Sequence, residues 1–163
     1  AAINPVALEP AIAPHLAAAQ AGIVLRAAEL ADHVRAQAAS GAEALLVEGA
    51  GGWLVPLNET ETMADLAVAL GYPVILVVGM RLGCINHALL TAAAITAAGL
   101  QLAGWVANVL DADMAMLDGN IAALQQRIDA PLLGVVPHQR QADAREAATC
   151  LDLKLLAQAD GHD

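Results

Sequence analysis

The chain contains no phenylalanine, one tyrosine, two tryptophans and a single lysine, Lys154. Its hydrophobic residues make up 58% of the 163, and they are therefore mainly aliphatic, with many alanines that favour helices. Basic residues are also few, with 7 Lys+Arg against 17 Asp+Glu. A chain of this charge offers no basic patch to a phosphate backbone, so we expect no nucleic-acid partner.

Cysteine is nearly absent too, because Cys84 and Cys150 are the only two and no C-x-x-C spacing occurs. Nothing requires a disulfide, and a reduced, cytoplasmic setting is the simpler interpretation. No basic stretch followed by an apolar one opens the sequence, so we expect no signal peptide. The uncharged run 82–110 has the length of a membrane span, but polar residues and glycines interrupt it. We expect a buried helix followed by a buried strand there, and no membrane partner.

Short apolar runs alternate with longer alanine- and leucine-rich runs along the chain. The short runs predict strands at Ala44–Glu48, Pro73–Gly79, Ala103–Asn108 and Leu132–Val136. The longer runs predict helices at Ile23–Ala39, Thr62–Leu70, Ile85–Ala98, Met114–Ile128 and Asp143–Ala159. The proline-containing opening, Asn4–Pro14, is expected to be an irregular arm. This order predicts an α/β fold in one domain over residues 1–163, a doubly wound, mostly parallel sheet with helices on both faces.

In open parallel sheets, ligands bind outside the carboxyl ends of the strands. That rule gathers four turns at one edge of the predicted sheet. They are Glu48–Gly52, Gly79–Asn86, Asn108 and Pro137–Gln139.

The first of these turns places a lone acid, Glu48, before Gly49-Ala50-Gly51-Gly52. A carboxylate at a strand end that faces phosphates commonly holds Mg²⁺, directly or through water. The glycines allow a ligand to approach backbone N–H groups closely. A solvated acid before a tight turn fits the same residues equally well.

The second turn leads into a long helix that begins near Cys84-Ile85-Asn86. Free N–H groups at such a helix start form an anion site, although a simple helix cap explains the residues as well. Arg81 either pairs with that anion or lies on the surface. Asn108 either meets a base edge or caps its loop. The five histidines form no spaced ligand set for zinc, and no G-x-S-x-G nucleophile elbow occurs.

A nucleotide enzyme of this kind is expected to carry the phosphate loop G-x-x-x-x-G-K-[ST]. It does not occur in these residues, because Lys154 is the only lysine and no glycine precedes it at that spacing. An apparent Mg²⁺ acid and a candidate base-recognition turn are thus present without the phosphate cradle.

The sequence closely resembles the dethiobiotin synthetase family of biotin synthesis. The resemblance rests on motifs that run through nearly the whole chain in order. They are Asn4-Pro5 with Pro14-His15, Val47–Trp53 with Pro56-Leu57, Pro73–Gly79, Leu82–Ala88, Ala103–Asn108 and Pro131–Gly134 with Pro137. The combination of LGCINHA at 82–88 with AGWVAN at 103–108 is more specific than EGAGG at 48–52, which other phosphate-loop families share.

The resemblance implies a P-loop NTPase-like fold, a homodimer and an ATP- and Mg²⁺-dependent ligase. Its substrates would be 7,8-diaminopelargonate, CO₂ and ATP. One amine becomes a carbamate, ATP phosphorylates it, and the second amine closes the ureido ring. Glu48 would bind Mg²⁺, and the Gly51 N–H would lie near the reacting carbamate. The ATP-binding set would be Glu48, Gly49, Ala50, Gly51, Asn108, Val109, Pro137, His138 and Gln139. The helix start at Cys84, Ile85 and Asn86 would bind the substrate carboxylate across the dimer, together with Gly51 at the reacting end.

Two departures from the family pattern follow. The family's N-terminal strand, phosphate loop and following helix have no counterpart in these residues, and that region supplies the carbamate-binding lysine and a second metal-binding acid. We therefore expect a C-terminal part of the enzyme that is inactive by itself. A tyrosine that family members use near the substrate carboxylate falls at Asn120 here.

Two other classes of protein are compatible with parts of this pattern. A cobyrinate-type amide synthase or a ParA-like ATPase shares the strand-end acid, but LGCINHA speaks against both. A non-catalytic binding module would explain the missing lysine loop.

Overall fold

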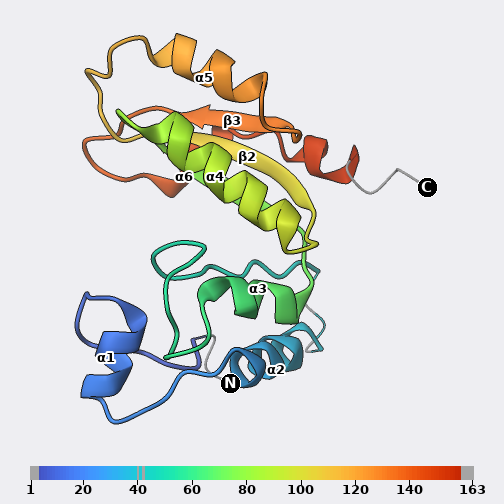
Figure 1. Cartoon of the computed structure of the whole chain (residues 1–163). Coiled ribbons are helices and arrows are strands. Elements are labelled where there is room, and N and C mark those ends of the chain that lie inside the picture. The colour runs from blue at the N-terminus through green and yellow to red at the C-terminus, as the bar shows by residue number, and fades with distance from the viewer. Residues whose placement is uncertain (1–3, 40, 42, 159–163) are drawn as a thin grey trace. The chain divides into compact units, whose positions relative to one another are not determined.

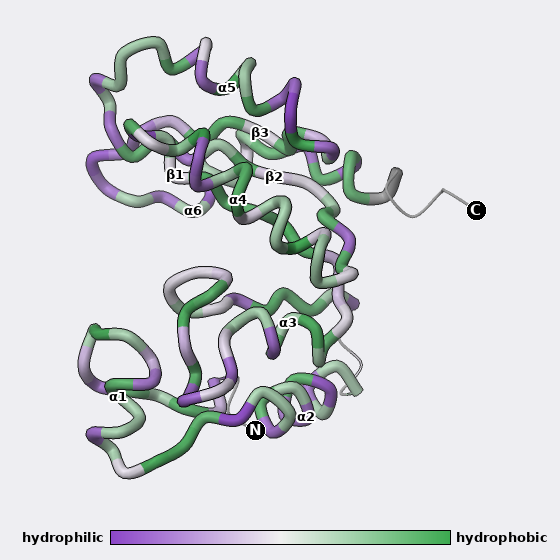
Figure 2. The backbone as a smooth tube through the Cα atoms, in the orientation of Figure 1, coloured by the Kyte–Doolittle hydropathy of each residue, from purple (hydrophilic) through white to green (hydrophobic). Residues whose placement is uncertain are grey.

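A computed structural model describes residues 4–39, 41 and 43–158 of the chain. The backbone divides between Tyr72 and Pro73 into two compact units. Each unit has a hydrophobic cluster of its own. Hydrophobic and hydrophilic segments alternate along the backbone of both units (Figures 1 and 2). The expectation of a single domain over residues 1–163 stays a prediction.

The first unit is built from three helices and long irregular segments. The helices are α1 (Pro14–Gln20), α2 (Ala27–Ala38) and α3 (Met63–Leu70). Helix α2 packs against α3, and one hydrophobic cluster of the unit contains the buried residues Ala18, Leu25, Ala27 and Leu57. Helix α1 was not predicted, although proline at its first position and the alanines that follow are typical of a helix start.

The predicted strand at Ala44–Glu48 is wrong, since residues 44–49 form neither strand nor helix. A strand persists only when a neighbour takes up its backbone hydrogen bonds. Within the described part of the chain, no segment pairs with this one. Its apolar side chains consequently lie open, with Leu46 84% exposed.

The second unit carries a three-stranded parallel sheet in the order β1-β2-β3. Its elements are β1 (Val74–Met80), α4 (Cys84–Ala97), β2 (Leu102–Val109), α5 (Leu117–Gln125), β3 (Leu132–Val136), α6 (Ala144–Thr149) and the 3₁₀ helix η1 (Leu153–Gln158). The parallel α/β prediction is confirmed, and three of the four predicted strands lie within one residue of their expected ends.

The core of this unit lies between the sheet and helices α4 and α5 (Figure 1). Central strand β2 contributes Trp105, which is fully buried, and Ala107 and Val109 on the same face. Burying one tryptophan removes roughly 150–250 Å² from water, which contributes about 4–6 kcal/mol before entropy is counted. On β1, Val78 joins this core, whereas the alternate residue Val77 is 60% exposed on the other face.

The uncharged run from 82 to 110 folds as helix α4 followed by strand β2, as expected. Helix α4 is hydrophobic over most of its length (Figure 2). Among the described residues, no helix has both the length and the apolar character needed to cross a membrane.

Two predicted helices begin later than expected. The one predicted from Ile23 starts at Ala27, because Arg26 is extended and the preceding Leu25 carbonyl accepts a hydrogen bond from the distant Asn58. The one predicted from Met114 starts at Leu117, after the left-handed residue Met116 at φ +56°.

The predicted helix over Asp143–Ala159 is interrupted in the structure. It forms α6 and η1, because Leu151 forms an antiparallel bridge with Gly134 on β3 and breaks the helix there. Ala159 lies outside the described residues. The predictions over Thr62–Leu70 and Ile85–Ala98 are confirmed within one residue as α3 and α4.

Candidate active site

The carboxyl ends of the three strands lie side by side in register. Gly79 at the end of β1 is paired with Asn108 on β2, and Asn108 is paired with Val136 at the end of β3. The turns that follow these strands therefore leave from one edge of the sheet. Three of the four predicted site turns meet there, which is the edge where open parallel sheets bind ligands.

Asn108 is the polar side chain of β2 at this edge. It is half-buried, and it makes no hydrogen bond to the described residues. Its neighbour Val109 is 7% exposed and packs into the core, so its side chain is not available to a ligand. A Cβ on Gly79 would lie 2.6 Å from Leu110 Cδ1, so glycine at 79 lets the chain after β2 approach β1 closely.

In the turn after β3, Pro137 and His138 are exposed, whereas Gln139 is half-buried and forms hydrogen bonds within the chain. Gln139 Nε2 donates to Glu146 Oε2 at 3.1 Å and to the Asp143 carbonyl at 3.4 Å. Gln139 Oε1 accepts from the Asp143 N–H at 3.0 Å. The half-buried Gln139 side chain is thus bound to the segment that begins α6.

Helix α4 begins directly after the second turn. Gly83 is its N-cap, with φ +93°, and no side chain caps the helix. The Cys84 N–H donates to the Arg81 carbonyl at 3.0 Å, whereas those of Ile85 and Asn86 meet no acceptor among the described residues. Two free donors at the positive end of a fourteen-residue helix favour an anion.

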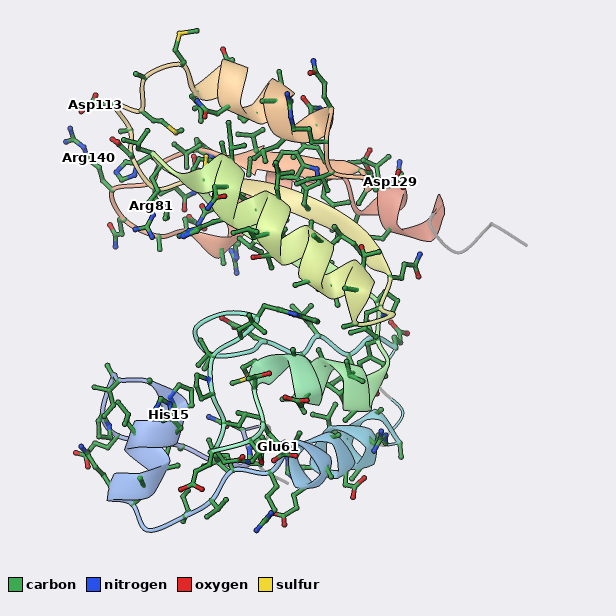
Figure 3. All side chains as sticks on the ribbon, viewed as in Figure 1. His15, Glu61, Arg81, Asp113, Asp129 and Arg140 are labelled. Atoms are coloured by element: carbon green, nitrogen blue, oxygen red, sulfur yellow. The ribbon has the colours of Figure 1, made fainter. Side chains whose placement is uncertain are left out.

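Two arginines lie at the same edge. Figure 3 shows Arg81 and Arg140 near Asp113 at the end of the unit where these turns lie, with Asp129 at the opposite end. The described ion pairs, Arg26–Glu29 and Arg35–Asp32, involve neither Arg81 nor Arg140. Neither guanidinium is therefore held by a carboxylate of the described residues, although the exposed Asp113 of the loop after β2 offsets part of their charge.

The acidic turn belongs to the first unit. Glu48 is exposed and makes no hydrogen bond or ion pair with the described residues. Gly51 has φ +94°, and a Cβ there would lie 2.7 Å from Val55 Cγ2. Glycine is therefore required at 51 for conformation and for space. That this turn joins the edge of the sheet stays a prediction.

Glu48 can supply one oxygen ligand to a metal ion. Within the described ranges, no group of three or more His, Cys, Asp or Glu side chains is placed to hold an ion. Mg²⁺ commonly binds through one or two carboxylates together with phosphate oxygens and waters, rather than in an all-protein cage. A single unpaired carboxylate fits an ion shared with a nucleotide.

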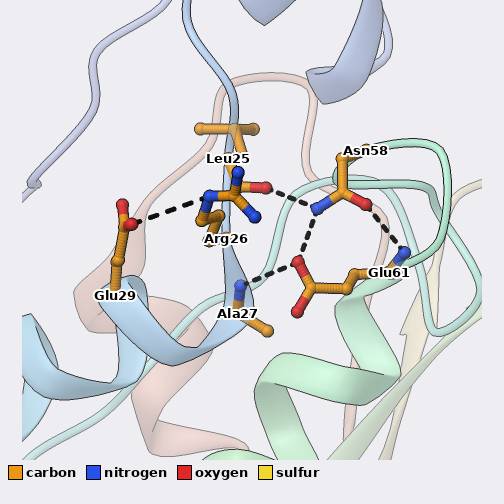
Figure 4. Close-up of polar contacts among 6 residues, drawn as sticks. All are labelled: Leu25, Arg26, Ala27, Glu29, Asn58 and Glu61. Atoms are coloured by element: carbon orange, nitrogen blue, oxygen red, sulfur yellow. Dashed lines mark hydrogen bonds and ion pairs between the residues drawn. The ribbon is translucent and has the colours of Figure 1, made fainter.

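Polar side chains also fix the loop that follows the acidic turn. Asn58 Nδ2 donates to the Leu25 carbonyl at 2.7 Å and to Glu61 Oε2 (Figure 4). Glu61 Oε2 also accepts from the Ala27 N–H at 3.4 Å, and so satisfies an orphan donor at the start of α2. The sequence analysis missed this network, because its links to Leu25 and Ala27 span more than thirty residues.

Asn120 lies in the first turn of α5, and its side chain is bound within that turn. Its Nδ2 donates to the Met116 carbonyl at 2.8 Å, on its own helix α5. The partners of Gln139 were also missed. A local signal for them exists, since Asp143-x-x-Glu146 is a helix-start pattern, and Asp143 Oδ1 accepts from the Glu146 N–H at 3.2 Å.

The chain is similar in sequence to known proteins of one family. Residues 1–146 match a family model described as an AAA domain. The chain is 60% identical over 157 residues to a protein of Cellvibrio japonicus, and 56% and 55% identical over 154 residues to proteins of Pseudomonas paraeruginosa and Pseudomonas aeruginosa. The alignments cover 94–96% of this chain and 68% of each relative. All three relatives are named ATP-dependent dethiobiotin synthetase BioD.

Proposed function

The chain belongs to the family of ATP-dependent dethiobiotin synthetases, ligases of biotin synthesis, and we propose that its sheet edge binds the ATP on which that reaction depends. The observation that carries the proposal is the register that aligns Gly79, Asn108 and Val136. Asn108 has a free amide, which carries both a donor and an acceptor for the edge of adenine. The exposed Pro137-His138 turn borders it and supplies backbone groups.

Glu48 and Gly51 are proposed to act at the reacting end of the nucleotide. Glu48 would hold Mg²⁺, which supplies charge neutralisation to the phosphates when bound. Gly51 leaves its N–H uncovered by a side chain, so that a carbamate oxygen can approach it. Gly49 and Ala50 lie in the same exposed turn and would contact the nucleotide through their backbone.

The start of α4 is proposed to receive the carboxylate of 7,8-diaminopelargonate. The unpartnered N–H groups of Ile85 and Asn86 support this role, and Cys84 is buried beneath them. The closing reaction would join CO₂ to one amine as a carbamate, phosphorylate it from ATP, and release phosphate as the second amine attacks. A homodimer in which a partner contributes this helix start is part of the same proposal.

Family membership favours this function over the amide-synthase, ParA-like and non-catalytic alternatives. The 163 residues contain no G-x-x-x-x-G-K-[ST] loop, so they do not themselves contain the usual cradle for the triphosphate. We therefore expect the 163-residue chain, expressed by itself, to show no ATP-dependent ring closure.

The proposal is tested by turnover of 7,8-diaminopelargonate, CO₂ and ATP to dethiobiotin in the enzyme with its whole chain. Glu48→Gln removes the charge and keeps the shape, and we expect kcat to fall at least a hundredfold, with a weakened dependence on Mg²⁺. Asn108→Ala should raise the KM for ATP by about tenfold, the equivalent of about 1.4 kcal/mol.

Glu59→Gln is the matched control for Glu48→Gln. Glu59 is an exposed carboxylate of the same unit that makes no hydrogen bond to the described residues, and its substitution should leave kcat unchanged. Equal activities of the Glu48→Gln and Glu59→Gln enzymes would refute the metal role of Glu48.

A further inference from the structure

We propose that Gln139 is a positioning residue of the nucleotide turn, whose side chain fixes Pro137-His138 in place and does not itself contact the nucleotide. The inference rests on the proposed ATP site at this edge of the sheet. It changes the role that the family resemblance suggested for Gln139, which was direct contact with ATP.

The hydrogen-bonding capacity of Gln139 is nearly used up within the chain. A glutamine amide has two N–H donors and an oxygen with two lone pairs. Both donors are engaged, by Glu146 Oε2 and by the Asp143 carbonyl, and one lone pair accepts from the Asp143 N–H. Recognition of adenine by a side-chain amide uses a donor and an acceptor together. Gln139 has no donor left for this, whereas Asn108 has its whole amide.

The backbone around Gln139 shows what these bonds achieve. The chain leaves β3 at Pro137, passes through α6 and returns to β3, where Leu151 pairs with Gly134 and the Asp152 N–H donates to the Leu133 carbonyl at 2.8 Å. We call residues 137–150 the β3 excursion. Its base is closed by these backbone bonds.

Gln139 closes the middle of the β3 excursion. Its amide donates a hydrogen bond to the Asp143 carbonyl and accepts one from the Asp143 N–H. Asp143 is the N-cap of α6. The Pro137-His138 turn is therefore tied to a helix start that is itself capped. Without the Gln139 amide, the excursion would still be closed by its backbone bonds to β3, but the Pro137-His138 turn would no longer be bound to Asp143. ATP would then have to order this turn on binding, which would weaken its affinity.

The test compares variants by the KM for ATP and by kcat. Gln139→Leu keeps the size of the side chain and removes all three bonds. We expect the KM for ATP to rise at least fivefold, with kcat within twofold of the wild type. Thr149→Val is the matched control, because it removes a bond of α6 that does not involve Gln139, from Thr149 Oγ1 to the Glu146 carbonyl. It should leave the KM unchanged.

An exchange of the two side chains separates positioning from direct contact. Gln139→Glu places a carboxylate against Glu146, and we expect a rise of about tenfold in the KM for ATP. Adding Glu146→Gln restores the bond between the two side chains with donor and acceptor reversed, whereas the bond to the Asp143 carbonyl stays lost. The double variant should therefore recover part of the loss, with a KM for ATP about threefold lower than that of Gln139→Glu. A direct contact between Gln139 and ATP predicts no such rescue.

Two results would overturn the inference. One is an unchanged KM in Gln139→Leu while Asn108→Ala raises it, which would leave the ATP site in place. The other is a double variant whose KM for ATP is no lower than that of Gln139→Glu alone. If Gln139→Leu and Asn108→Ala both leave the KM unchanged, the proposed ATP site itself fails. Should Gln139→Leu not fold, Glu146→Ala is measured in its place, and we expect its KM for ATP to rise about threefold. An unchanged KM for ATP in Glu146→Ala would count against the inference.

Discussion

At the scale of single residues, small side chains decide how closely segments approach one another. Gly134 is the clearest case, because a Cβ there would lie 2.0 Å from the carbonyl oxygen of Cys150. That oxygen belongs to the backbone and cannot rotate away. The contact between β3 and the returning chain therefore depends on the absence of one methyl group.

We predict that Gly134→Ala lowers the free energy of unfolding by about 3 kcal/mol, since the methyl group would push Leu151 out of its bridge with β3. Urea unfolding of the enzyme measures this change. Gly119→Ala is the control, because the nearest atom to its Cβ is Met116 Cε at 3.8 Å and the residue lies in α5. It should stabilise by about 0.5–1 kcal/mol. Equal stability of Gly134→Ala and the wild type would contradict the prediction.

At the scale of elements, helix starts are specified locally. Thr62 and Asp65 form a capping box at the start of α3, in which the Thr62 N–H and hydroxyl donate to Asp65 Oδ2 at 2.6 and 2.9 Å. These hydrogen bonds, that from the backbone N–H first, lower the pKa of Asp65 below its ordinary value. The folded state therefore prefers the charged carboxylate.

The sign of the pH dependence follows from this lowered pKa. The stabilising contribution is fully present above the pKa that Asp65 has in the unfolded chain, about 4, and is lost as the pH falls through the lower folded value. We expect Asp65→Asn to cost about 0.5–1 kcal/mol at pH 7 and progressively less below pH 4. Urea unfolding from pH 3 to 7 tests this.

Asp118→Asn provides the comparison for Asp65→Asn. Asp118 also lies in the first turn of a helix, α5, but makes no hydrogen bond to the described residues. Comparing the two variants therefore separates the effect of the capping hydrogen bonds from the effect of a negative charge near a helix start. An equal loss in both variants would argue against the capping role.

Features set by neighbouring residues were predictable from the sequence, and those set by distant partners were not. Strand β3 and the capped helix α3 are encoded within a few residues. The late start of α2 depends on Asn58, thirty-three residues away, and the break at Cys150 depends on Gly134. Ala44–Glu48 has the composition of a strand but no partner among the described residues. At the candidate site, the strand register brings three of the predicted turns to one edge, as expected. The role proposed for Gln139 could not be predicted, because it depends on hydrogen bonds to Asp143 that only the structure shows.

At the scale of the molecule, large apolar side chains lie exposed in both units. Val77 lies on β1, which is an outer strand of the described sheet, and Leu46 lies on the unpaired segment of the other unit. An open strand edge with apolar neighbours is a template for association between chains.

We predict that the 163-residue chain, expressed by itself, associates into dimers or larger species despite its net charge of −10. Val77→Lys should reduce the associated fraction severalfold, because a charge on an outer strand opposes edge pairing. Val68→Lys, on helix α3, adds the same charge away from the sheet and should have a smaller effect. Light scattering measures both, and a wild-type chain that stays monomeric at every concentration would contradict the prediction.

The β3 excursion has a consequence for how such enzymes diversify. Because it leaves one strand and returns to the same strand, its two ends are fixed together independently of what lies between them. Doubling the length of such a loop costs only about 0.6 kcal/mol in closure entropy. The tip of the excursion can therefore be lengthened, shortened or exchanged as a module while the sheet beneath it is inherited intact. If the Pro137-His138 turn binds the nucleotide as proposed, nucleotide preference can change in the same way.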